Sequence, residues 1–267
     1  MKTGRMKKQG IIFLVCLLLL GAVGCGTGTT PETNSSIEGL VEGGKLIFVV
    51  DDSVVPCVYR NAEGELEGFE YDCGNAIAEY LGLEPVWVSN AWENLITTVQ
   101  AGKADAIVDG LYITEERKKA INYCESYYSM DCVIVVAEGN ESIVKPEDLV
   151  GKKVGVQPAS PDGDYVRALG VKDIVEYSKI PDGMSDLLNG RIDAYVTESL
   201  SAAYYAKSGG YELRMDQPLG SFEVGIATNK NAPEVTAAIN EAIRALKEDG
   251  TLSAISVKWF GEDIIKR

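Results

Sequence analysis

Acidic residues follow two apolar segments that have the composition of buried strands. Residues 45–50 are followed by Asp51, and residues 104–108 are followed by Asp109. Ligands of open α/β sheets collect at the carboxyl ends of parallel strands, so both acids are candidates for contact with a polar or positively charged ligand. The alternatives are a cap on a neighbouring turn or helix, or a solvated acid in a loop.

Two interpretations of Arg117 are open. It lies three residues after Thr114, a good N-cap residue, so it falls in the first turn of a predicted helix, where a cation opposes the helix dipole. A solvated surface arginine beside Lys118 and Lys119 is the simpler interpretation. A buried carboxylate, on the other hand, is bound best by a fixed guanidinium group, which Arg117 could supply.

The composition excludes several kinds of chemistry. The chain has no histidine, so histidine triads, histidine proton shuttles and histidine metal ligands are absent. Its cysteines show no C-x-x-C spacing, which argues against zinc and redox sites, and no metal or cofactor is predicted. In an exported protein, the four cysteines of the predicted folded part could pair in three ways or remain free thiols. These four are Cys57, Cys73, Cys124 and Cys132.

The charge of the chain limits the class of partner. The 267 residues include 25 Lys and Arg and 40 Asp and Glu, so the formal net charge is −15. A field of this sign repels phosphate backbones, and nucleic acid is therefore not an expected partner. Hydrophobic residues make up 46% and charged residues 24%, which is typical of a globular protein with a sizeable core.

The N-terminus has the pattern of an export signal. Four basic residues lie between positions 2 and 8, an apolar run covers residues 11–20, and small residues 21–24 precede Cys25. The run is short for a membrane-spanning helix, which needs about 20 apolar residues. The segment resembles the lipobox of bacterial lipoproteins, although Ala22 replaces the usual Leu. A plain secreted protein or an uncleaved anchor are the alternatives.

The resemblance predicts a lipid-anchored, extracytoplasmic protein. Residues 1–24 are predicted to be a signal peptide, and Cys25 is predicted to carry the lipid. Residues 26–36 are small and polar, so we expect residues 25–44 to form a flexible tether. The chain ends at Arg267 with no apolar span after residue 261, so no C-terminal anchor is expected.

Strands and helices alternate in the first half of the remaining chain, which predicts a mostly parallel sheet in an α/β fold. A helix is expected after Asp72, which could cap it, and Gly82 would close it. A second helix is expected over residues 92–99, because apolar side chains recur there at helical spacing. Strands are predicted at 45–50, 84–88 and 104–108.

The second half repeats this alternation. Ser160 and Pro161 are expected to begin a helix, as a cap and a first-turn proline. Strands are predicted at 153–156, 174–177 and 191–196, and helices at 184–188 and 235–249. Apolar runs at 133–137 and 222–227 could cross between two lobes. The predicted lobes are residues 45–133 with 222–267, and residues 137–218.

Seven short motifs resemble those of a known family, in the family's order and spacing. The family is the amino-acid-binding class of extracytoplasmic solute-binding proteins of ABC importers, family 3, and the resemblance covers nearly all of residues 45–261. The motifs are EGFEYD (67–72), WENLI (92–96), GKADAI (102–107), ITEERKK (113–119), GKKVGVQ (151–157), GRIDA (190–194) and DGT (249–251).

The resemblance implies a fold and a site. The fold would be the two-lobed periplasmic-binding-protein fold of type II, with a mixed, mostly parallel sheet in each lobe, a two-strand hinge and the ligand between the lobes. Arg117 would bind the ligand carboxylate, and Glu198, where the family usually has Asp, would bind the ammonium with help from Asp51. Trp92 would contact the side chain, although core packing explains it equally well. The remaining expected site residues are Asp109, Gly110, Tyr112 and Ser160.

The sequence departs from the family at several expected site positions. Val54 and Cys57 replace aromatic residues, and Asp109 and Tyr112 replace small or hydroxyl residues. Ser160 and Pro161 replace paired threonines, so one backbone N–H donor is lost and the carboxylate site is weaker. The ligand specificity of other family members can therefore not be transferred to this chain.

The predicted function is capture of an amino acid and its delivery to an ABC transporter permease by a monomer that is not an enzyme. Three acids against one arginine favour a basic or strongly hydrogen-bonding ligand over Glu, Asp or an aliphatic one. If Asp109 turns outward, a neutral ligand such as glutamine or cystine becomes the alternative. Two other functions remain as alternatives. One is an enzyme resembling cyclohexadienyl dehydratase, with Asp109 or Glu198 as general acid, and the other is a sensor-type amino-acid receptor.

Overall fold

A computed structural model describes residues 37–208, 210–214 and 218–266. The predicted signal peptide, Cys25 and residues 26–36 of the predicted tether lie outside these residues. The prediction that the tether extends to residue 44 is wrong, because Ile37 and Leu40 pack on the core and the Val41 backbone N–H donates to Asp105 at 2.7 Å. Within the described part, no helix combines the length and apolar character needed to cross a membrane. All four described cysteines are buried free thiols, which answers the question that their spacing left open.

The first sheet is mixed, with strand order β5-β1-β6-β14-β7. β1 runs parallel to β5 and β6, whereas β14 runs antiparallel to β6 and β7. Its strands are β1 (Lys45–Val50), β5 (Glu84–Ser89), β6 (Ala106–Ile107), β7 (Asn122–Tyr123) and β14 (Ala227–Thr228). Five of the six β1 residues are buried, as expected for a central strand that is covered on both faces.

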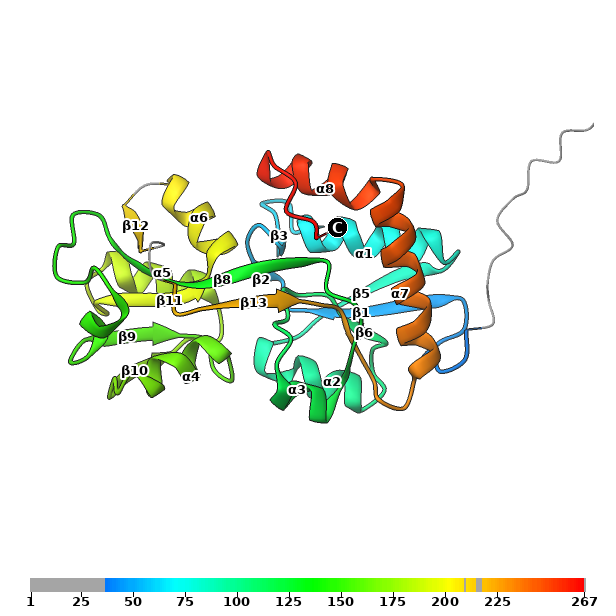
Figure 1. Ribbon diagram of the computed structural model, residues 1–267, viewed down its shortest axis with the longest axis horizontal. Helices are drawn as coiled ribbons and strands as arrows, with labels where there is room; N and C mark the ends of the chain where they lie inside the picture. Colours follow the sequence, from blue (N-terminus) through cyan, green and yellow to red (C-terminus); the bar gives the residue numbers. More distant parts are fainter. Residues whose placement is uncertain (1–36, 209, 215–217, 267) are drawn as a thin grey trace, which may run out of the picture. The chain divides into compact units, whose positions relative to one another are not determined.

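Helices cover both faces of this sheet (Figure 1). Apolar side chains of α1 (Phe69–Tyr80), α7 (Pro233–Glu248) and α8 (Thr251–Phe260) form one core with Leu46 and Phe48 of β1. Side chains of the short 3-10 helix η1 (Trp92–Asn94) and of α2 (Leu95–Gln100) pack on the other face with Ile47 and Val49. α3 (Glu115–Ala120) follows on the same side (Figure 1).

The second sheet has strand order β10-β9-β11-β8-β12, and β13 pairs with β8 beyond this path. Its strands are β8 (Tyr128–Ala137), β9 (Lys153–Val156), β10 (Asp173–Glu176), β11 (Ala194–Glu198), β12 (Tyr211–Arg214) and β13 (Gly220–Val224). The helices of this part are η2 (Pro146–Leu149), α4 (Pro161–Ala168), α5 (Ile180–Leu188) and α6 (Ser199–Ser208). We call the parts built on the first and second sheets lobe 1 and lobe 2.

Two antiparallel strands, β8 and β13, connect the lobes (Figure 1). Tyr128 and Met130 of β8 belong to the core of lobe 1, whereas Cys132 and Ile134 belong to a core of lobe 2. The predicted two-lobed type II fold with a two-strand hinge is therefore confirmed. Because β8 contributes to both cores, the exact lobe boundaries stay a prediction.

Two local features differ from the sequence prediction. The first helix begins at Phe69, so Asp72 lies inside it and does not cap it; its carboxylate instead accepts hydrogen bonds from Lys258 and Trp259. Gly68 precedes this helix with a φ of 138°, and an added Cβ would lie 2.2 Å from the carbonyl oxygen of Cys57. The chain can therefore turn this closely only at a glycine.

The second difference is a small antiparallel sheet, which the sequence did not predict. Its strands are β2 (Ser53–Val54), β3 (Val58–Arg60) and β4 (Leu66–Glu67). Strands of two or three residues are too short to produce an alternating pattern. The chain turns between β3 and β4 at Gly64, which has a φ of 84°.

Candidate ligand-binding site

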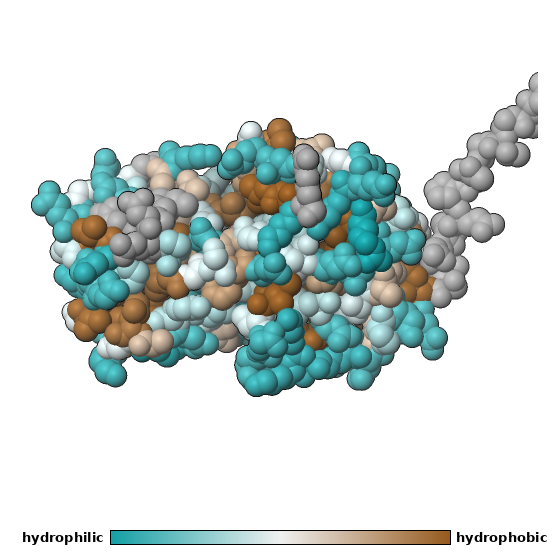
Figure 2. Space-filling model, viewed as in Figure 1, coloured by the Kyte–Doolittle hydropathy of each residue, from teal (hydrophilic) through white to brown (hydrophobic). Residues whose placement is uncertain are grey.

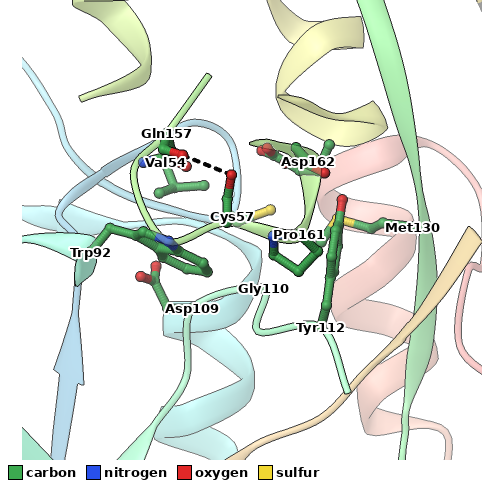
Figure 3. A pocket seen from close by; sticks show the side chains of 12 residues that line it. Val54, Cys57, Trp92, Asp109, Gly110, Tyr112, Met130, Gln157, Pro161 and Asp162 are labelled. Atoms are coloured by element: carbon green, nitrogen blue, oxygen red, sulfur yellow. Dashed lines mark hydrogen bonds between the residues drawn. The ribbon is translucent and has the colours of Figure 1, made fainter. Parts of the chain in front are cut away.

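A pocket lies between the two lobes (Figure 3). Side chains of both lobes line it, which places it where a hinge motion would open and close it. The lining residues are Val54, Cys57, Trp92, Asp109, Gly110, Tyr112, Met130, Gln157, Ser160, Pro161, Asp162 and Glu198. Six of the eight predicted ligand-binding residues are in this set.

The lobe 1 wall comes from the segment that follows β6. Asp109, Gly110 and Tyr112 lie there, at the carboxyl end of a central strand, as the sequence predicted. Gly110 has a φ of 60° and donates a backbone hydrogen bond of 3.2 Å to Glu70. Glu70 is completely buried and also accepts from two tyrosine hydroxyls of the Tyr127–Tyr128 pair, so it holds the Gly110 backbone in place.

Trp92 contributes to the core and also lines the pocket, and its contact with the ligand side chain stays a prediction. Its ring packs at the edge of the apolar cluster beneath the first sheet, and the same side chain lines the pocket. It lies in a 3-10 turn and not in the α-helix that the spacing predicted, since α2 begins only at Leu95.

The lobe 2 wall comes from the β9–α4 connection and from the end of β11. Ser160 caps α4 as expected, because its Oγ accepts from the backbone N–H of Gly163 at 3.1 Å. Pro161 occupies the first helical turn and Asp162 follows it. Glu198 is the last residue of β11, and its carboxylate accepts a hydrogen bond of 2.5 Å from Thr197.

Buried polar atoms without partners concentrate at this pocket. Five of its side chains each have a buried atom with no hydrogen-bond partner among the described residues: Asp109 Oδ1, Tyr112 Oη, Gln157 Nε2, Asp162 Oδ1 and Glu198 Oε1. Leaving such groups unpaired costs about 1–3 kcal/mol each. A ligand that pairs with them would recover this free energy, so the cluster marks a binding site.

Burial raises the pKa values of the carboxyl groups in the pocket. It raises the pKa of Glu198 from 4.5 to about 7 and that of Asp162 from 3.8 to about 6. The pKa of Asp109 lies well above its ordinary value, because of burial and the nearby charge of Asp51. These acids are at most 7% exposed, so water does little to stabilise their charges.

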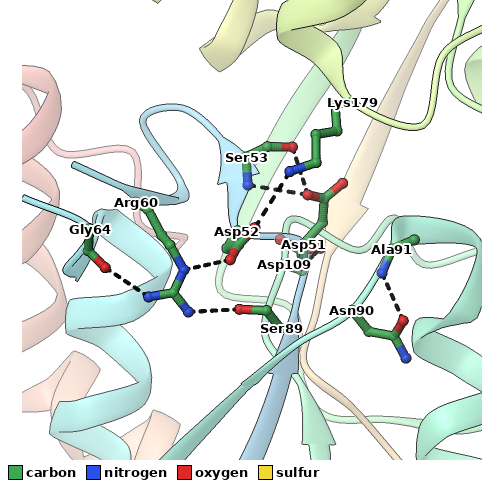
Figure 4. Close-up of polar contacts among 10 residues, drawn as sticks. All are labelled: Asp51, Asp52, Ser53, Arg60, Gly64, Ser89, Asn90, Ala91, Asp109 and Lys179. Carbon is green, nitrogen blue, oxygen red and sulfur yellow. Dashed lines mark hydrogen bonds and ion pairs between the residues drawn. The ribbon is translucent and has the colours of Figure 1, made fainter. Parts of the chain in front are cut away.

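Asp51 supports the pocket from behind and is not part of its wall. Its backbone N–H donates to Asp109 Oδ2 at 2.9 Å, and its own Oδ1 accepts from the Ser53 hydroxyl at 2.6 Å (Figure 4). Its Oδ2 is buried without a partner among the described residues. Asp51 instead lines a neighbouring cavity, together with Lys179 of lobe 2.

Arg117 is half-buried, unlike its exposed neighbours Lys118 and Lys119 on α3. Lys118 and Lys119 are exposed and pair with Glu115 and Glu116, which form the hydrophilic surface over α3 in Figure 2. Thr114 caps the helix through the Arg117 backbone N–H, as predicted. The interpretation of Arg117 as a solvated surface residue is therefore wrong.

The Arg117 guanidinium is held close to the pocket but is not among its lining residues. It donates to the carbonyl oxygens of Tyr112 at 3.2 Å and Ala159 at 3.3 Å, and it lies 5.3 Å from the centroid of the Trp92 ring. Burial lowers its pKa. Its predicted role as the ligand's carboxylate partner stays a prediction.

The sequence reasoning missed Asp162 and Gln157 as site residues. Both lie close to Ser160, which the sequence did single out: Gln157 is three residues before it and Asp162 two residues after it. An acid in the first turn of a helix is usually explained by the helix dipole, so Asp162 gave no separate signal. Val54 and Cys57, noted as departures from the family, do line the pocket. Among the described residues, no cluster has the composition of a metal site.

Direct contacts from one segment of lobe 2 join it to lobe 1. Lys179 of lobe 2 lies 4.0 Å from the carboxylate of Asp52, which also pairs with Arg60 (Figure 4). The Ser178 hydroxyl donates to Glu93 at 3.4 Å. Polar contacts thus bridge the two lobes outside the pocket wall.

A two-lobed α/β fold with a pocket between the lobes is typical of proteins that bind a small ligand. The chain belongs to the bacterial extracellular solute-binding proteins, family 3, whose model matches residues 46–262. The predicted family is thereby confirmed.

Individual relatives agree with this assignment. The chain is 28% identical to the L-cystine-binding protein TcyJ of Escherichia coli (strain K12) over 270 residues, covering 100% of both chains. An ancestral arginine-binding protein bound to glutamine matches with a TM-score of 0.78 and 34% identity, over 83% of this chain and 100% of that one. The ancestral amino acid-binding protein AncCDT-1, a precursor of cyclohexadienyl dehydratase, matches with a TM-score of 0.77 and 29% identity, over 81% and 96% of the two chains.

Proposed function

We propose that this protein captures a positively charged amino acid outside the cytoplasm and delivers it to the permease of an ABC importer. The observation that carries the proposal is the set of carboxyl groups with unpartnered buried oxygens between the lobes. A buried acid without a partner is costly, and a ligand ammonium or guanidinium group would neutralise it.

Basic amino acids are the first candidates for the ligand. Glu198 would bind one cationic group, and Asp109 another, because the two acids approach the pocket from opposite lobes. Trp92 would pack against the aliphatic stem or the cation of the ligand. The similarity to an arginine-binding protein supports this choice, whereas the similarity to TcyJ keeps cystine as the alternative.

We further propose that the protein is anchored by a lipid on Cys25 after removal of residues 1–24. The support is the export signal and its small residues before the cysteine. The polar stretch 26–36 would then separate the binding lobes from the membrane surface.

A thermal-shift screen of the amino acids tests the proposed ligand class. Stabilisation by Arg, Lys, ornithine or His is expected, since a ligand that binds only the folded state raises the unfolding temperature. A response restricted to Glu, Asp or Leu would contradict the proposal. In the Asp109→Asn variant, the response to the basic ligands should fall.

A second candidate is an enzyme of the cyclohexadienyl dehydratase type. Burial raises the pKa of Glu198 to about 7, which suits a general acid, and the chain is similar to a protein described as a precursor of such an enzyme. Incubation with prephenate or arogenate tests this candidate. Formation of an aromatic product would support the enzyme, and no product above the uncatalysed rate would reject it.

A further inference from the structure

The charges on the pocket wall are strongly unbalanced. Asp109, Asp162 and Glu198 line it, whereas no Lys or Arg occurs among the described residues that do so. Each of these acids has a buried oxygen without a partner among the described residues. The unpartnered groups that could donate, Tyr112 Oη and Gln157 Nε2, are both neutral. A carboxylate on the ligand would therefore meet three acids and no cation in the wall.

Two donors of Arg117 are occupied by the chain itself. They bond to the Tyr112 and Ala159 carbonyl oxygens, and the guanidinium lies over Trp92. Burial lowers the pKa of Arg117 and raises that of Asp162, and the opposite charges of the two groups favour each other. Asp162 therefore competes with a ligand carboxylate for Arg117.

The N-terminus of α4 is also poorly suited to hold a carboxylate. Pro161 has no N–H, and the N–H of Gly163 is occupied by Ser160 Oγ. Asp162 places a carboxylate in the first turn, where it is 6% exposed, faces the pocket and contacts the Cys132 thiol. Figure 3 shows the Tyr112 hydroxyl pointing toward the same region. The helix dipole therefore stabilises the protein's own acid.

We infer that this pocket prefers an amine or guanidine that lacks an α-carboxylate over the matching basic amino acid, with Asp162 occupying the place of the ligand carboxylate. The inference rests on the proposed capture of a cationic ligand and narrows its chemical class. A decarboxylated ligand keeps the cations that pair with Asp109 and Glu198 and removes the group that would repel Asp162.

Calorimetric titration of the full chain with three matched pairs tests the inference. The pairs are arginine and agmatine, lysine and cadaverine, and ornithine and putrescine. We expect the amine of at least one pair to bind tenfold or more tightly than its amino acid. A ratio below ten in every pair would overturn the inference but leave the proposed function intact if an amino acid binds. If no member of any pair and no other amino acid binds, the proposed function fails as well.

The variant Asp162→Asn separates recognition from a structural role. Asparagine keeps the shape of the side chain and removes its charge, so the amine-to-amino-acid affinity ratio should fall at least tenfold. Asp164→Asn is the matched control, because Asp164 lies in the same helix with a side chain that is 82% exposed, and its ratio should not change. An equal loss of affinity for both members of a pair in Asp162→Asn, at unchanged thermal stability, would overturn the role of Asp162.

Discussion

Replacing Glu198 by glutamine should stabilise the ligand-free protein at alkaline pH. Glu198 is 7% exposed at the end of β11, and its Oε1 has no partner among the described residues. Its charge is therefore poorly solvated in the folded state but well solvated in the unfolded chain. Glutamine has a similar shape, can keep the hydrogen bond with Thr197 and carries no charge.

The magnitude follows from the pKa of Glu198, which burial raises from 4.5 to about 7. Because the folded state binds the proton more tightly, this group favours folding below its unfolded pKa, and that contribution is lost as the pH rises through about 7. At 1.36 kcal/mol per unit, the total loss by pH 8 is about 3 kcal/mol. The variant should avoid this loss.

Denaturant unfolding, followed by circular dichroism at pH 5 and pH 8, measures the effect. Phosphate and acetate buffers are suitable because they contain no amine that could occupy the pocket. We expect the free energy of unfolding of Glu198→Gln to exceed that of the wild type by about 3 kcal/mol at pH 8 and by about 1 kcal/mol at pH 5. The control Glu241→Gln removes an exposed charge from α7 and should leave the difference between the two pH values unchanged.

Equal stabilities of wild type and Glu198→Gln at both pH values would refute the reasoning, as would a variant that is less stable at pH 8. The same substitution should weaken the binding of a cationic ligand by about thirtyfold, which corresponds to about 2 kcal/mol. A gain in stability combined with a loss of binding is expected where a site holds unpaired charges for its ligand.

Three further predictions concern the ligand, Arg117 and the N-terminus. Affinity for a cationic ligand should increase from pH 5.5 to pH 8, and binding should release protons, because the cation lowers the pKa values of Asp162 and Glu198 from about 6 and about 7. Calorimetry in buffers of different ionisation enthalpy measures the number of protons released. Proton uptake on binding would contradict the prediction. Arg117→Gln should weaken the binding of agmatine less than threefold. If Arg117 instead binds a ligand carboxylate, the same variant should weaken the binding of arginine by about thirtyfold. Cys25→Ser should release the protein from the membrane fraction without lowering its melting temperature, and continued membrane association of the variant would count against a lipid anchor.

Much of the fold was predictable because its signals are local. Buried strands β1 and β9 are continuous apolar runs, and Thr114 and Ser160 cap their helices as their residue types predict. The crossing strands were recognisable as apolar runs without a helical partner, although β8 extends five residues further toward the N-terminus than predicted. Asp72 was misjudged, because the close approach of Gly68 to Cys57, which decides where α1 begins, is a tertiary contact.

The site was predictable only in part. Motif positions identified Asp109, Tyr112 and Glu198, and the structure brings them to one pocket. They could not show that Arg117 donates to Ala159 or that Asp162 faces the pocket, since both facts depend on how lobe 2 packs against lobe 1. The balance of charges that line the pocket therefore depends on the folded chain and cannot be predicted from any single motif.

Native mass spectrometry of the protein, purified under conditions that retain its ligand, identifies what the pocket holds in the cell. The carboxyl groups of Asp109, Asp162 and Glu198 predict a bound compound that is positively charged at neutral pH. Its mass should correspond to a basic amino acid or to the amine derived from one, and Glu198→Gln should carry less of it. A dicarboxylic or aliphatic amino acid retained at full occupancy would contradict the proposal that this pocket recognises a cation.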